Sequence, residues 1–491
     1  MSIATRIKKF CLRNFSRKRI GDCLQRYQYN RILLTDSLVK RYRLKRRKIL
    51  NLDMYKWTDT DITGFLGNHY GDQVIILDSE LSWAVYETST PHVFVVNCDN
   101  YTTLEYNGLL LWELCKVSII KYQGKLILPG STKLTDDDLN CISRFYGWAV
   151  NCIDVVGRVL DDKRPDVVVL TQGGVYDSRI IAELARRKGI TAVALENSLS
   201  SAHFYADNMT GQILNRHALA LTGGFLDECN ALPVTTARLQ VNRFFQQALA
   251  SKEPDHQTGN AADPVDLASM LSIPRDSRII LFLGQVRTDG SIILDSTVYP
   301  DPVTLVEQLI KIMQAHPDYF LIVRLHPKED TNDRLSYGYG RDQRELCYHA
   351  TFNELNMRGI TSTDRVRIIH DRQIDTYALM KLSNVGITIN SQSGLEMALL
   401  GKPVITAGRC FYAGKGFTRE LVRPQLLDVV LADALNHPQT VEEYTCLMRF
   451  CHYLFFDYMI PKDLSSNTHR LARLMGLEVN DDQRQAKYIR E

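Results

Sequence analysis

The chain has 491 residues, of which 45% are hydrophobic and 23% charged, and its formal net charge is +3. These proportions are typical of a globular protein with two or three domains and exclude a largely disordered chain. No apolar run approaches the ~20 residues that cross a bilayer, and the N-terminus lacks a secretory signal, so we expect a cytoplasmic protein. Eleven scattered cysteines without a C-x-x-C pair favour reduced thiols over disulfides, and we expect no metal site.

Residues 1–69 are predicted to form a basic, helical N-terminal arm. Residues 1–48 carry a formal charge of +14, because sixteen Lys or Arg side chains are opposed by Asp22 and Asp36 alone. Such an arm could contact an anionic membrane surface, bind nucleic acid, or form a solvated pair of basic helices. The rest of the chain has no recognisable nucleic-acid module. We therefore expect no nucleic-acid partner and favour peripheral contact of residues 1–48 with the inner membrane.

Residues 70–249 alternate short β-branched runs with segments of helical period, which predicts a parallel sheet covered by helices. The candidate strands are QVIILD, HVFVVN, DVVVLTQGG, TAVALEN and HALAL. The clearest unit, residues 166–196, is predicted to be strand, loop, helix and strand. Asp177 is placed to cap its helix, and a role as a site residue is an equally good interpretation.

Residues 250–266 are polar and rich in turn formers, and we interpret them as an interdomain linker. A second alternating series occupies residues 267–440, with strands in RIILFLGQV, FLIVRLHP, VRIIH, VGITIN and KPVIT and a helix over residues 303–314. Residues 441–491 are predicted to form a helical tail. The fold class is therefore α/β, with two Rossmann-like doubly wound domains facing a cleft, as in the GT-B architecture. In such sheets ligands bind beyond the carboxyl ends of the strands.

Three polar clusters follow strands of the second domain. They are Gln285 in GQVRTDGSI, His326 in RLHPKE, and the set Ser391, Ser393 and Glu396 in NSQSGLE. The N–H groups at a helix start, together with serine hydroxyls, suit phosphate oxygens without a metal, and a histidine could supply a proton. Glu396 is placed to accept hydrogen bonds from ribose hydroxyls. Taken alone, Ser393 and Glu396 fit a capping box better than a ligand site.

Together these motifs resemble a known family. GQVRTDGSI, RLHPKE, NSQSGLEMALLGKPV and FYAGKGFT are similar, in the same order, to motifs of the bacterial capsule polysaccharide biosynthesis proteins, the KpsC- and KpsS-type β-Kdo transferases. The resemblance covers most of residues 166–418. It implies a retaining GT-B glycosyltransferase that uses CMP-Kdo as its substrate, without a further cofactor, and passes Kdo to a glycolipid or oligosaccharide acceptor. It also implies that Gln285, His326, Ser391, Ser393 and Glu396 hold the CMP portion.

The resemblance further suggests where a catalytic carboxylate lies. The family's acidic motif corresponds to LENSLSSAHFYADNMTG, in which Glu196 matches but Asn197 stands where Asp is usual, and Asp207 resembles a later acidic element. Glu196 is the preferred catalytic candidate, followed by Asp177 and Asp207. For Glu196, solvation or pairing with Arg179 is the alternative.

Four further residues are candidate substrate ligands. Arg179 and His203 could hold the carboxylate of an acidic sugar. Tyr412 and Lys415, in the glycine-rich FYAGKGFT loop, could close over the donor, and packing beneath the sheet edge is an alternative for Tyr412. Two other functions remain open: a nucleotide-sugar 2-epimerase of GT-B architecture, and a noncatalytic sugar-nucleotide-binding subunit of a polysaccharide assembly complex, which the Asn197 departure suggests.

Overall fold

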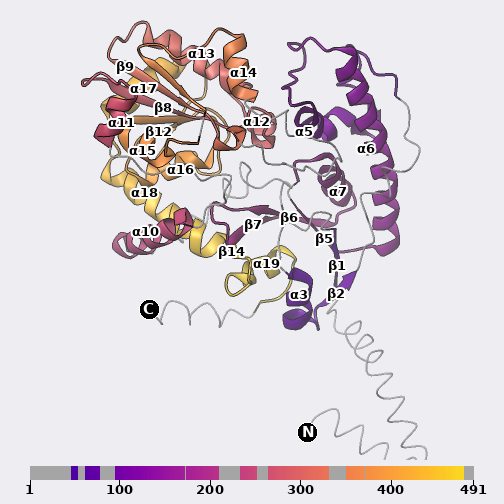
Figure 1. The fold of residues 1–491 in the computed structure, drawn as a ribbon. Helices are drawn as coiled ribbons and strands as arrows, with labels where there is room; N and C mark the ends of the chain where they lie inside the picture. Colours follow the sequence, from indigo (N-terminus) through magenta and orange to yellow (C-terminus); the bar gives the residue numbers. More distant parts are fainter. Residues whose placement is uncertain are drawn as a thin grey trace, which may run out of the picture.

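The structure is a computed structural model that describes residues 46–52, 61–77, 94–171, 173–208, 233–250, 264–330, 350–370 and 372–479. It contains two six-stranded sheets, each covered by helices, that form two adjoining domains (Figure 1). The predicted α/β class with two Rossmann-like domains is confirmed. In the described ranges, no helix is both long and apolar enough to cross a membrane.

The first sheet has the strand order β14-β7-β6-β5-β1-β2. Its strands are β1 (Arg47–Asn51), β2 (Val74–Leu77), β5 (Val167–Thr171), β6 (Thr191–Asn197), β7 (His203–Asp207) and β14 (Ile460–Pro461). Strands β2, β1, β5 and β6 are parallel, whereas β7 runs antiparallel to β6 and β14 antiparallel to β7. All five residues of β5 are buried, as expected for a parallel strand covered on both faces.

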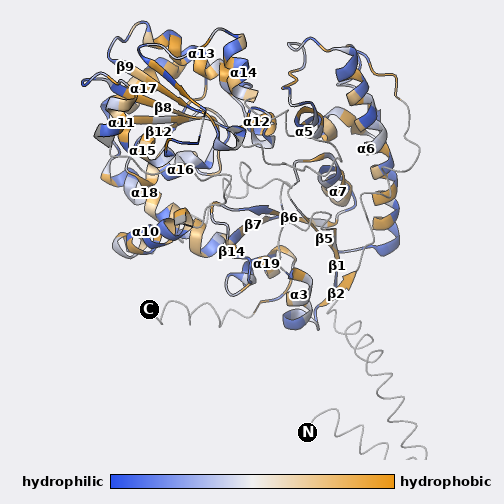
Figure 2. Cartoon of the chain, in the orientation of Figure 1, coloured by the Kyte–Doolittle hydropathy of each residue, from blue (hydrophilic) through white to orange (hydrophobic). Residues whose placement is uncertain are grey.

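Helices α3 (Ile62–Tyr70), α5 (Leu111–Gln123), α6 (Asp136–Lys163) and α7 (Tyr176–Arg187) belong to this domain, with a small hairpin of β3 (Glu105–Tyr106) and β4 (Leu109–Leu110). Helix α6 begins with a capping box between Thr135 and Asp138. Its buried residues recur at helical spacing, and Figure 2 shows hydrophobic and hydrophilic positions alternating along it. Its apolar face therefore packs on the domain core.

Two predictions for this domain need correction. Strand β1 lies within residues 1–69, the predicted arm, yet it pairs with both β2 and β5. The sequence does not indicate this strand, because its first two residues, Arg47 and Lys48, continue the basic run of the arm. The next two residues, Ile49 and Leu50, are apolar and fully buried. The predicted strand HVFVVN is described from residue 94 and is not a strand there, because Asn97 turns the chain by accepting hydrogen bonds from the N–H groups of Asp99 and Asn100. HALAL lies outside the described residues.

The second sheet is entirely parallel, in the order β10-β9-β8-β11-β12-β13. Its strands are β8 (Arg278–Leu283), β9 (Tyr319–Arg324), β10 (Val366–Ile369), β11 (Val385–Thr388), β12 (Val404–Thr406) and β13 (Arg419–Glu420). Its helices are α12 (Gly290–Asp295), α13 (Pro302–Met313), α14 (Ala350–Met357), α15 (Thr376–Leu382), α16 (Gln392–Leu399) and α17 (Leu427–Asn436). Every strand predicted for this domain is present, and the predicted helix over residues 303–314 is α13.

The chain crosses between the domains twice. Helices α10 (Val234–Ala250) and α11 (Pro264–Met270) flank the predicted linker, whose residues 251–263 lie outside the described ranges. After the second sheet, α18 (Val441–His452) packs against α10 and continues into a π-helix (Tyr453–Tyr458), β14 and α19 (Thr468–Leu474). The predicted helical tail thus contains a strand that joins the first sheet (Figure 1).

Candidate functional site

The polar residues of the second domain meet where its strand order reverses. The chain leaves β8 toward β9 and β10 on one side, and leaves β11 toward β12 and β13 on the other. Gln285 follows β8 and Asn390 follows β11. The Gln285 Nε2 donates to Asn390 Oδ1 at 2.7 Å, and the Asn390 backbone N–H donates to Gln285 Oε1 at 3.0 Å. This reciprocal pair lies at the topological switch point, the usual ligand position of an open α/β sheet.

Asn390 extends this network to α12. Its Nδ2 donates to the carbonyl oxygen of Ser291 at 3.0 Å, and Gln285 Nε2 also donates to Ser291 Oγ at 3.1 Å. Asn390 is buried, and the sequence analysis did not select it as a site residue. The signal that could have found it is a polar side chain placed directly after a fully buried strand.

Helix α16 begins at this edge, and its start differs from the predicted capping box. Ser391 is the N-cap, and its Oγ accepts a hydrogen bond from the Ser393 backbone N–H at 3.2 Å. Ser393 is therefore inside the helix, and Glu396 does not occupy the capping position three residues after the N-cap. The capping-box interpretation is wrong, because the cap lies two residues earlier than Ser393.

Glu396 instead contacts α15. It is buried and lies beside Tyr377, whose pKa is raised first by burial and then by the nearby Glu396 carboxylate. A carboxylate positioned between two helices at the ligand edge is arranged to accept hydrogen bonds from hydroxyl groups. Tyr377 is a second residue that sequence reasoning missed, since nothing in its local sequence distinguishes it from a core aromatic.

Tyr412 lies beneath α16. Its side chain is fully buried, and its hydroxyl donates to the carbonyl oxygen of Ser391 at 2.6 Å. Gly394 leaves room for this hydroxyl, since a Cβ at that position would lie 2.2 Å from it. Packing beneath the sheet edge, the alternative given for Tyr412, is the arrangement found, and Tyr412 supports the helix start from below.

The remainder of the FYAGKGFT loop turns on two glycines. Gly414 and Gly416 have positive φ angles of 69° and 83°, which favour glycine. Glu420 holds the loop by accepting hydrogen bonds from the Gly414 N–H, at 2.8 Å, and from the Thr418 hydroxyl. Lys415 lies between the two glycines, half-buried, and burial lowers the pKa of its ammonium group.

His326 follows β9 and opens a short 3₁₀ helix, Pro327–Asp330. The Glu329 N–H donates to the His326 carbonyl oxygen at 3.0 Å. The buried Glu329 carboxylate accepts hydrogen bonds from the Thr351 backbone N–H at 3.0 Å and from the Thr351 hydroxyl at 2.5 Å. Burial raises the pKa of Glu329 to about 7, although these hydrogen bonds and Arg287 oppose the shift. Glu329, which the sequence analysis did not select, thus anchors the turn that carries His326.

Arg287 fixes the loop after β8. Its guanidinium pairs with Asp301 at 2.9 Å and with Glu354 at 2.9 Å, which ties the GQVRTDGSI motif to α13 and α14. Arg358 pairs with the same two carboxylates, at 2.6 and 2.8 Å. These partly buried pairs form a connected network, which holds the loop more firmly than isolated surface pairs would.

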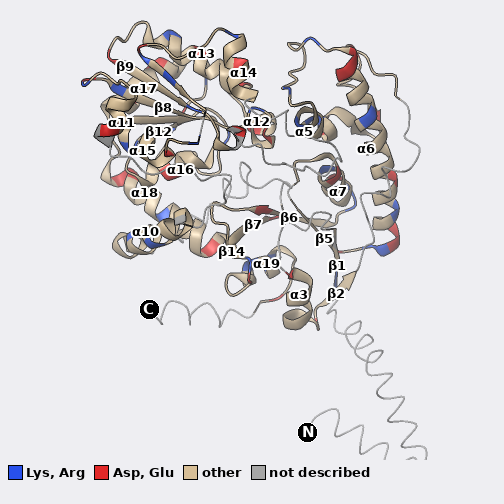
Figure 3. Ribbon diagram, viewed as in Figure 1, with Lys and Arg blue, Asp and Glu red and all other residues tan. Residues whose placement is uncertain are grey.

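In the first domain, the strand pair β6–β7 brings two predicted carboxylates onto one face. Glu196 lies directly opposite Tyr205, and Asp207 lies opposite Ala194, so Glu196, Tyr205 and Asp207 share a face of the sheet. Figure 3 shows the acidic segment on this strand pair. Asp207 is buried whereas Glu196 is partly exposed, so Glu196 is the more accessible of the two.

Two further predicted residues of this domain, Asp177 and Arg179, lie on α7. Asp177 is the second residue of α7, fully buried, and accepts a hydrogen bond from the Ser178 N–H at 2.7 Å. The N-cap is Val175, so Asp177 is not the predicted cap. Arg179, on the same helix, lies near Cys115 of α5: burial raises the pKa of that thiol, and Arg179 opposes the rise.

His203 lies at the start of β7, beside β14. Its Nδ1 is 3.0 Å from Ser200 Oγ, and its ring packs edge-on against Phe244 of α10. Burial lowers the pKa of His203, while Asp463 opposes the shift. His203 shares a strand face with Tyr205 and Asp207, because alternate residues of a strand point the same way.

The two domains adjoin at these edges. Helix α12, which follows the Gln285 loop, contacts α5, and α5 packs against α7. The ring of Phe411, from the glycine-rich loop, lies 6.2 Å from that of Tyr205 on β7. The switch-point network and the face with Glu196 are therefore connected through packed side chains.

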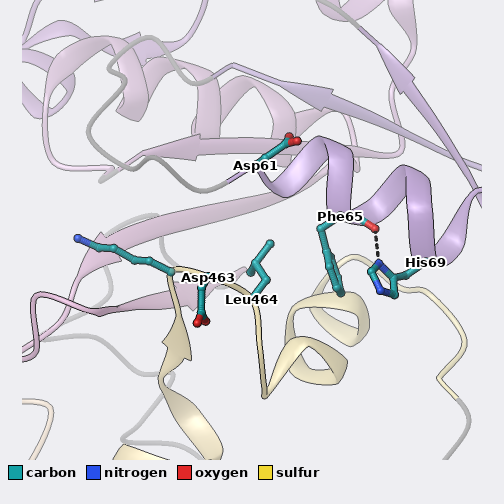
Figure 4. A pocket seen from close by; sticks show the side chains of 6 residues that line it. Asp61, Phe65, His69, Asp463 and Leu464 are labelled. Carbon is teal, nitrogen blue, oxygen red and sulfur yellow. Dashed lines mark hydrogen bonds between the residues drawn. The ribbon is translucent and has the colours of Figure 1, made fainter.

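No group of three or more His, Cys, Asp or Glu side chains is arranged to hold a metal ion in the part of the chain that the structure describes. A pocket of about 340 Å³ lies elsewhere, between α3 and the loop after β14 (Figure 4). It is lined by Asp61, Phe65, His69, Lys462, Asp463 and Leu464. None of the predicted site residues lines it.

By its fold, the chain is a two-domain α/β protein of GT-B-like architecture. Residues 260–426 match the family model described as "Capsule polysaccharide biosynthesis protein". That range contains the switch-point network, the His326 turn, α16 and the FYAGKGFT loop. The resemblance to the capsule polysaccharide biosynthesis proteins is thereby confirmed for the second domain.

Comparison with curated proteins gives no match. Among solved structures, the chain is similar to a KpsC β-Kdo 2,7 transferase of Thermosulfurimonas dismutans, with 16% identity and a TM-score of 0.38 over 74% of this chain and 95% of that one. It is also similar to the β-Kdo 2,4 transferase of that KpsC, with 16% identity and a TM-score of 0.39; the match covers 64% of this chain and 88% of that one. A third similar structure is a UDP-GlcNAc 2-epimerase of Methanocaldococcus jannaschii, with 13% identity and a TM-score of 0.28; the match covers 82% of this chain and 97% of that one. Likenesses of this strength carry no information on activity.

Proposed function

We propose that the protein is a glycosyltransferase of bacterial capsule or lipopolysaccharide biosynthesis that transfers an acidic sugar from a CMP-activated donor, with Kdo as the sugar. The observation that carries this proposal is the hydrogen-bonded pair Gln285–Asn390 at the switch point, next to the N-terminus of α16, inside the range that matches the capsule family. Helix N-terminal N–H groups and serine hydroxyls bind phosphate oxygens without a metal.

In this proposal the second domain holds the nucleotide. The start of α16, with Ser391 and Ser393, binds the phosphate of CMP, and Glu396 accepts hydrogen bonds from the ribose hydroxyls. His326 donates a proton or a hydrogen bond as the bond between the sugar and the phosphate breaks. Lys415, whose pKa is lowered by burial, lies in the neighbouring loop and offers a positive charge to the donor.

The first domain supplies the carboxylate. Glu196, the more exposed acidic residue on the β6–β7 face, acts on the anomeric carbon or the acceptor hydroxyl. A retaining reaction uses it as the nucleophile or the stabiliser of an ion pair, as the family resemblance implies, whereas an inverting reaction uses it as the general base. The anomeric configuration of the product, measured by NMR, distinguishes the two.

The acceptor and the membrane contact are parts of the same proposal. A glycolipid or oligosaccharide acceptor enters from the first domain, and residues 1–48, with their charge of +14, bring the enzyme to an anionic membrane surface. Deletion of residues 1–45, which leaves β1 whole, should then abolish sedimentation with vesicles that contain anionic lipid and leave nucleotide affinity unchanged. Equal sedimentation of the two proteins would contradict the membrane contact.

The first test is calorimetric titration of the full chain with CMP, UDP and GDP. We expect selective CMP binding that Glu396→Ala weakens by about tenfold or more, because it removes the proposed ribose contact. UDP preference would favour the 2-epimerase instead. The second test is release of CMP from CMP-Kdo with an oligosaccharide acceptor. If the wild type releases CMP and Glu196→Gln reduces that release by about a hundredfold, the result supports a transferase. CMP binding without any release of CMP from CMP-Kdo identifies a noncatalytic subunit.

A further inference from the structure

Two adjacent residues of the FYAGKGFT loop contact opposite sides of the site. The Tyr412 hydroxyl donates to the Ser391 carbonyl oxygen at the start of α16. The Phe411 ring, 5.2 Å from that of Tyr412 and nearly perpendicular to it, lies 6.2 Å from the ring of Tyr205 in the first domain. Two neighbouring side chains thus connect the helix start of one domain with a strand of the other.

Tyr205 is the residue through which this contact reaches the carboxylates. It lies directly opposite Glu196 in the β6–β7 pair and two residues before Asp207, on the same face of the sheet. On its other side it packs against Tyr458 of the returning chain, with ring centroids 6.0 Å apart. A displacement of Tyr205 would therefore move the strand face that presents Glu196.

The connection is made of buried side chains throughout. Tyr205, Phe411, Tyr412 and Tyr458 are each at most 2% exposed. Side chains in close-packed interiors transmit displacement instead of absorbing it, because they have no free volume into which to move. This row of rings therefore joins the start of α16 to the β6–β7 face.

We propose that Phe411 is a positioning residue that sets the distance between the nucleotide end of the site and the Glu196 carboxylate. The inference rests on the proposed function, in which the donor is held by α16 and the reaction occurs at the β6–β7 face. Phe411 itself touches neither substrate. Its loss should leave the binding of CMP intact and misplace the catalytic carboxylate, and misplacement of about 1 Å can cost on the order of a hundredfold in rate.

The same loop provides a matched control. Phe417 is as deeply buried as Phe411, at 1% exposure each, and both pack against Phe450 of α18, with centroid distances of 5.6 Å and 6.3 Å. The contact with Tyr205 is made by Phe411. Phe411→Leu and Phe417→Leu remove the same ring from the same cluster, and differ in whether the interdomain contact is lost.

The experiment compares Phe411→Leu, Phe417→Leu, Tyr205→Leu and the double variant Phe411→Leu/Tyr205→Leu in the full chain. For Phe411→Leu we expect a CMP dissociation constant within about twofold of the wild type and a kcat reduced at least about tenfold, whereas Phe417→Leu keeps both within about threefold. Tyr205→Leu should reproduce the effect of Phe411→Leu. The double variant should lose less than the two single effects combined, because both substitutions remove the same contact between Phe411 and Tyr205.

A second readout needs no turnover. Hydrogen exchange of the nucleotide-free protein should be faster in residues 194–207 and 388–396 of Phe411→Leu, and unchanged there in Phe417→Leu. Equal effects of the two leucine variants on kcat and exchange, or no effect of Phe411→Leu, overturn the positioning role. If the wild type transfers no sugar, the proposed function fails, and the exchange comparison still decides whether Phe411 couples the two segments.

Discussion

The hydroxyl of Tyr412 donates a hydrogen bond to the carbonyl oxygen of Ser391, 2.6 Å away, and so supports the N-cap of α16 from beneath. Both residues are buried. The position of the helix N-terminus therefore depends on a hydrogen bond from a side chain 21 residues further along the chain.

Removal of that hydroxyl should affect both stability and binding. Tyr412→Phe removes one of the donors to the buried Ser391 carbonyl oxygen, which still accepts a hydrogen bond from the Gly394 N–H at 3.1 Å, and we expect the free energy of unfolding to fall by about 0.5–1.5 kcal/mol. We also expect weaker CMP binding, because the cap moves. Urea unfolding and calorimetry measure the two effects.

Tyr146→Phe is the matched control for this change. Its hydroxyl donates to the Tyr101 carbonyl oxygen in the first domain and is equally buried. The control should lose a similar amount of stability and retain the wild-type affinity for CMP. Loss of affinity in both variants, or in neither, contradicts a specific role for the Tyr412 bond.

Gly394→Ala should disturb the same contact by steric conflict. The added Cβ would lie 2.2 Å from the Tyr412 hydroxyl oxygen, so the ring or α16 must move. We expect destabilisation of about 1–3 kcal/mol, partly relieved when Tyr412→Phe is combined with it. Thermal unfolding of the two single variants and the double variant measures this relief.

Gly157→Ala provides the comparison, since a Cβ there meets nothing within 4 Å in the middle of α6. Alanine is a better helix former than glycine, so this variant should gain about 0.5–1 kcal/mol. A loss in the double variant equal to the sum of the losses in Gly394→Ala and Tyr412→Phe would mean that the Tyr412 hydroxyl is not the atom in conflict.

Ser391 and Ser393 should separate capping from binding. Ser391→Ala removes the N-cap acceptor of α16 and should cost about 0.5–2 kcal/mol of stability. Ser393 lies inside the helix, so Ser393→Ala should change stability by less than about 0.5 kcal/mol. We expect weaker CMP binding from Ser393→Ala nonetheless. A Ser393→Ala protein with unchanged stability and unchanged affinity would remove this residue from the proposed phosphate site.

Glu329 should make stability depend on pH. Burial raises its pKa from an ordinary value of 4.5 to about 7, so the folded state holds this proton over a pH range in which the unfolded state has lost it. The contribution of Glu329 to the free energy of unfolding is fully present below about pH 4.5 and is lost as the pH rises through about 7. The loss amounts to about 3 kcal/mol.

Glu329→Gln removes the titrating group while keeping its shape. We expect the variant to lack this decline, which urea unfolding at pH 5 and pH 8 would measure as a smaller difference than in the wild type. A wild-type protein that is equally stable at both values, or a variant with an undiminished decline, would show that Glu329 is ionised in the folded state.

Much of the second domain could be predicted from its sequence, because fully buried parallel strands appear as continuous apolar runs with a polar residue at each carboxyl end. Gln285 and Ser391 were found by that rule. Asn390 has the same position but was passed over as part of a turn. The cap at Ser391 could not be chosen over Ser393 by spacing, because Ser393 is followed by Glu396 at the capping-box distance whereas Ser391 is followed there by Gly394. The hydrogen bond from Tyr412 is a long-range contact that no local pattern indicates.

The first domain was harder to predict for a different reason. Strand β1 begins with Arg47 and Lys48, and its charge concealed a buried pair of apolar residues. Asp177 appears at a helix start, but the preceding Val175 is the residue that leaves helical geometry, and the sequence offers no signal for that shift. The contact between Phe411 and Tyr205 joins residues from separate domains, so no local pattern indicates it.

The return of β14 to the edge of the first sheet has a consequence for synthesis of the chain. A ribosome produces residues 460–461 only after the entire second domain, so the first sheet lacks its last strand while the second can already fold. Pairings between segments so far apart in sequence form late and slowly. The N-terminal domain is therefore the later of the two to be completed, and the face that carries Glu196 reaches its final form only when the end of the chain arrives.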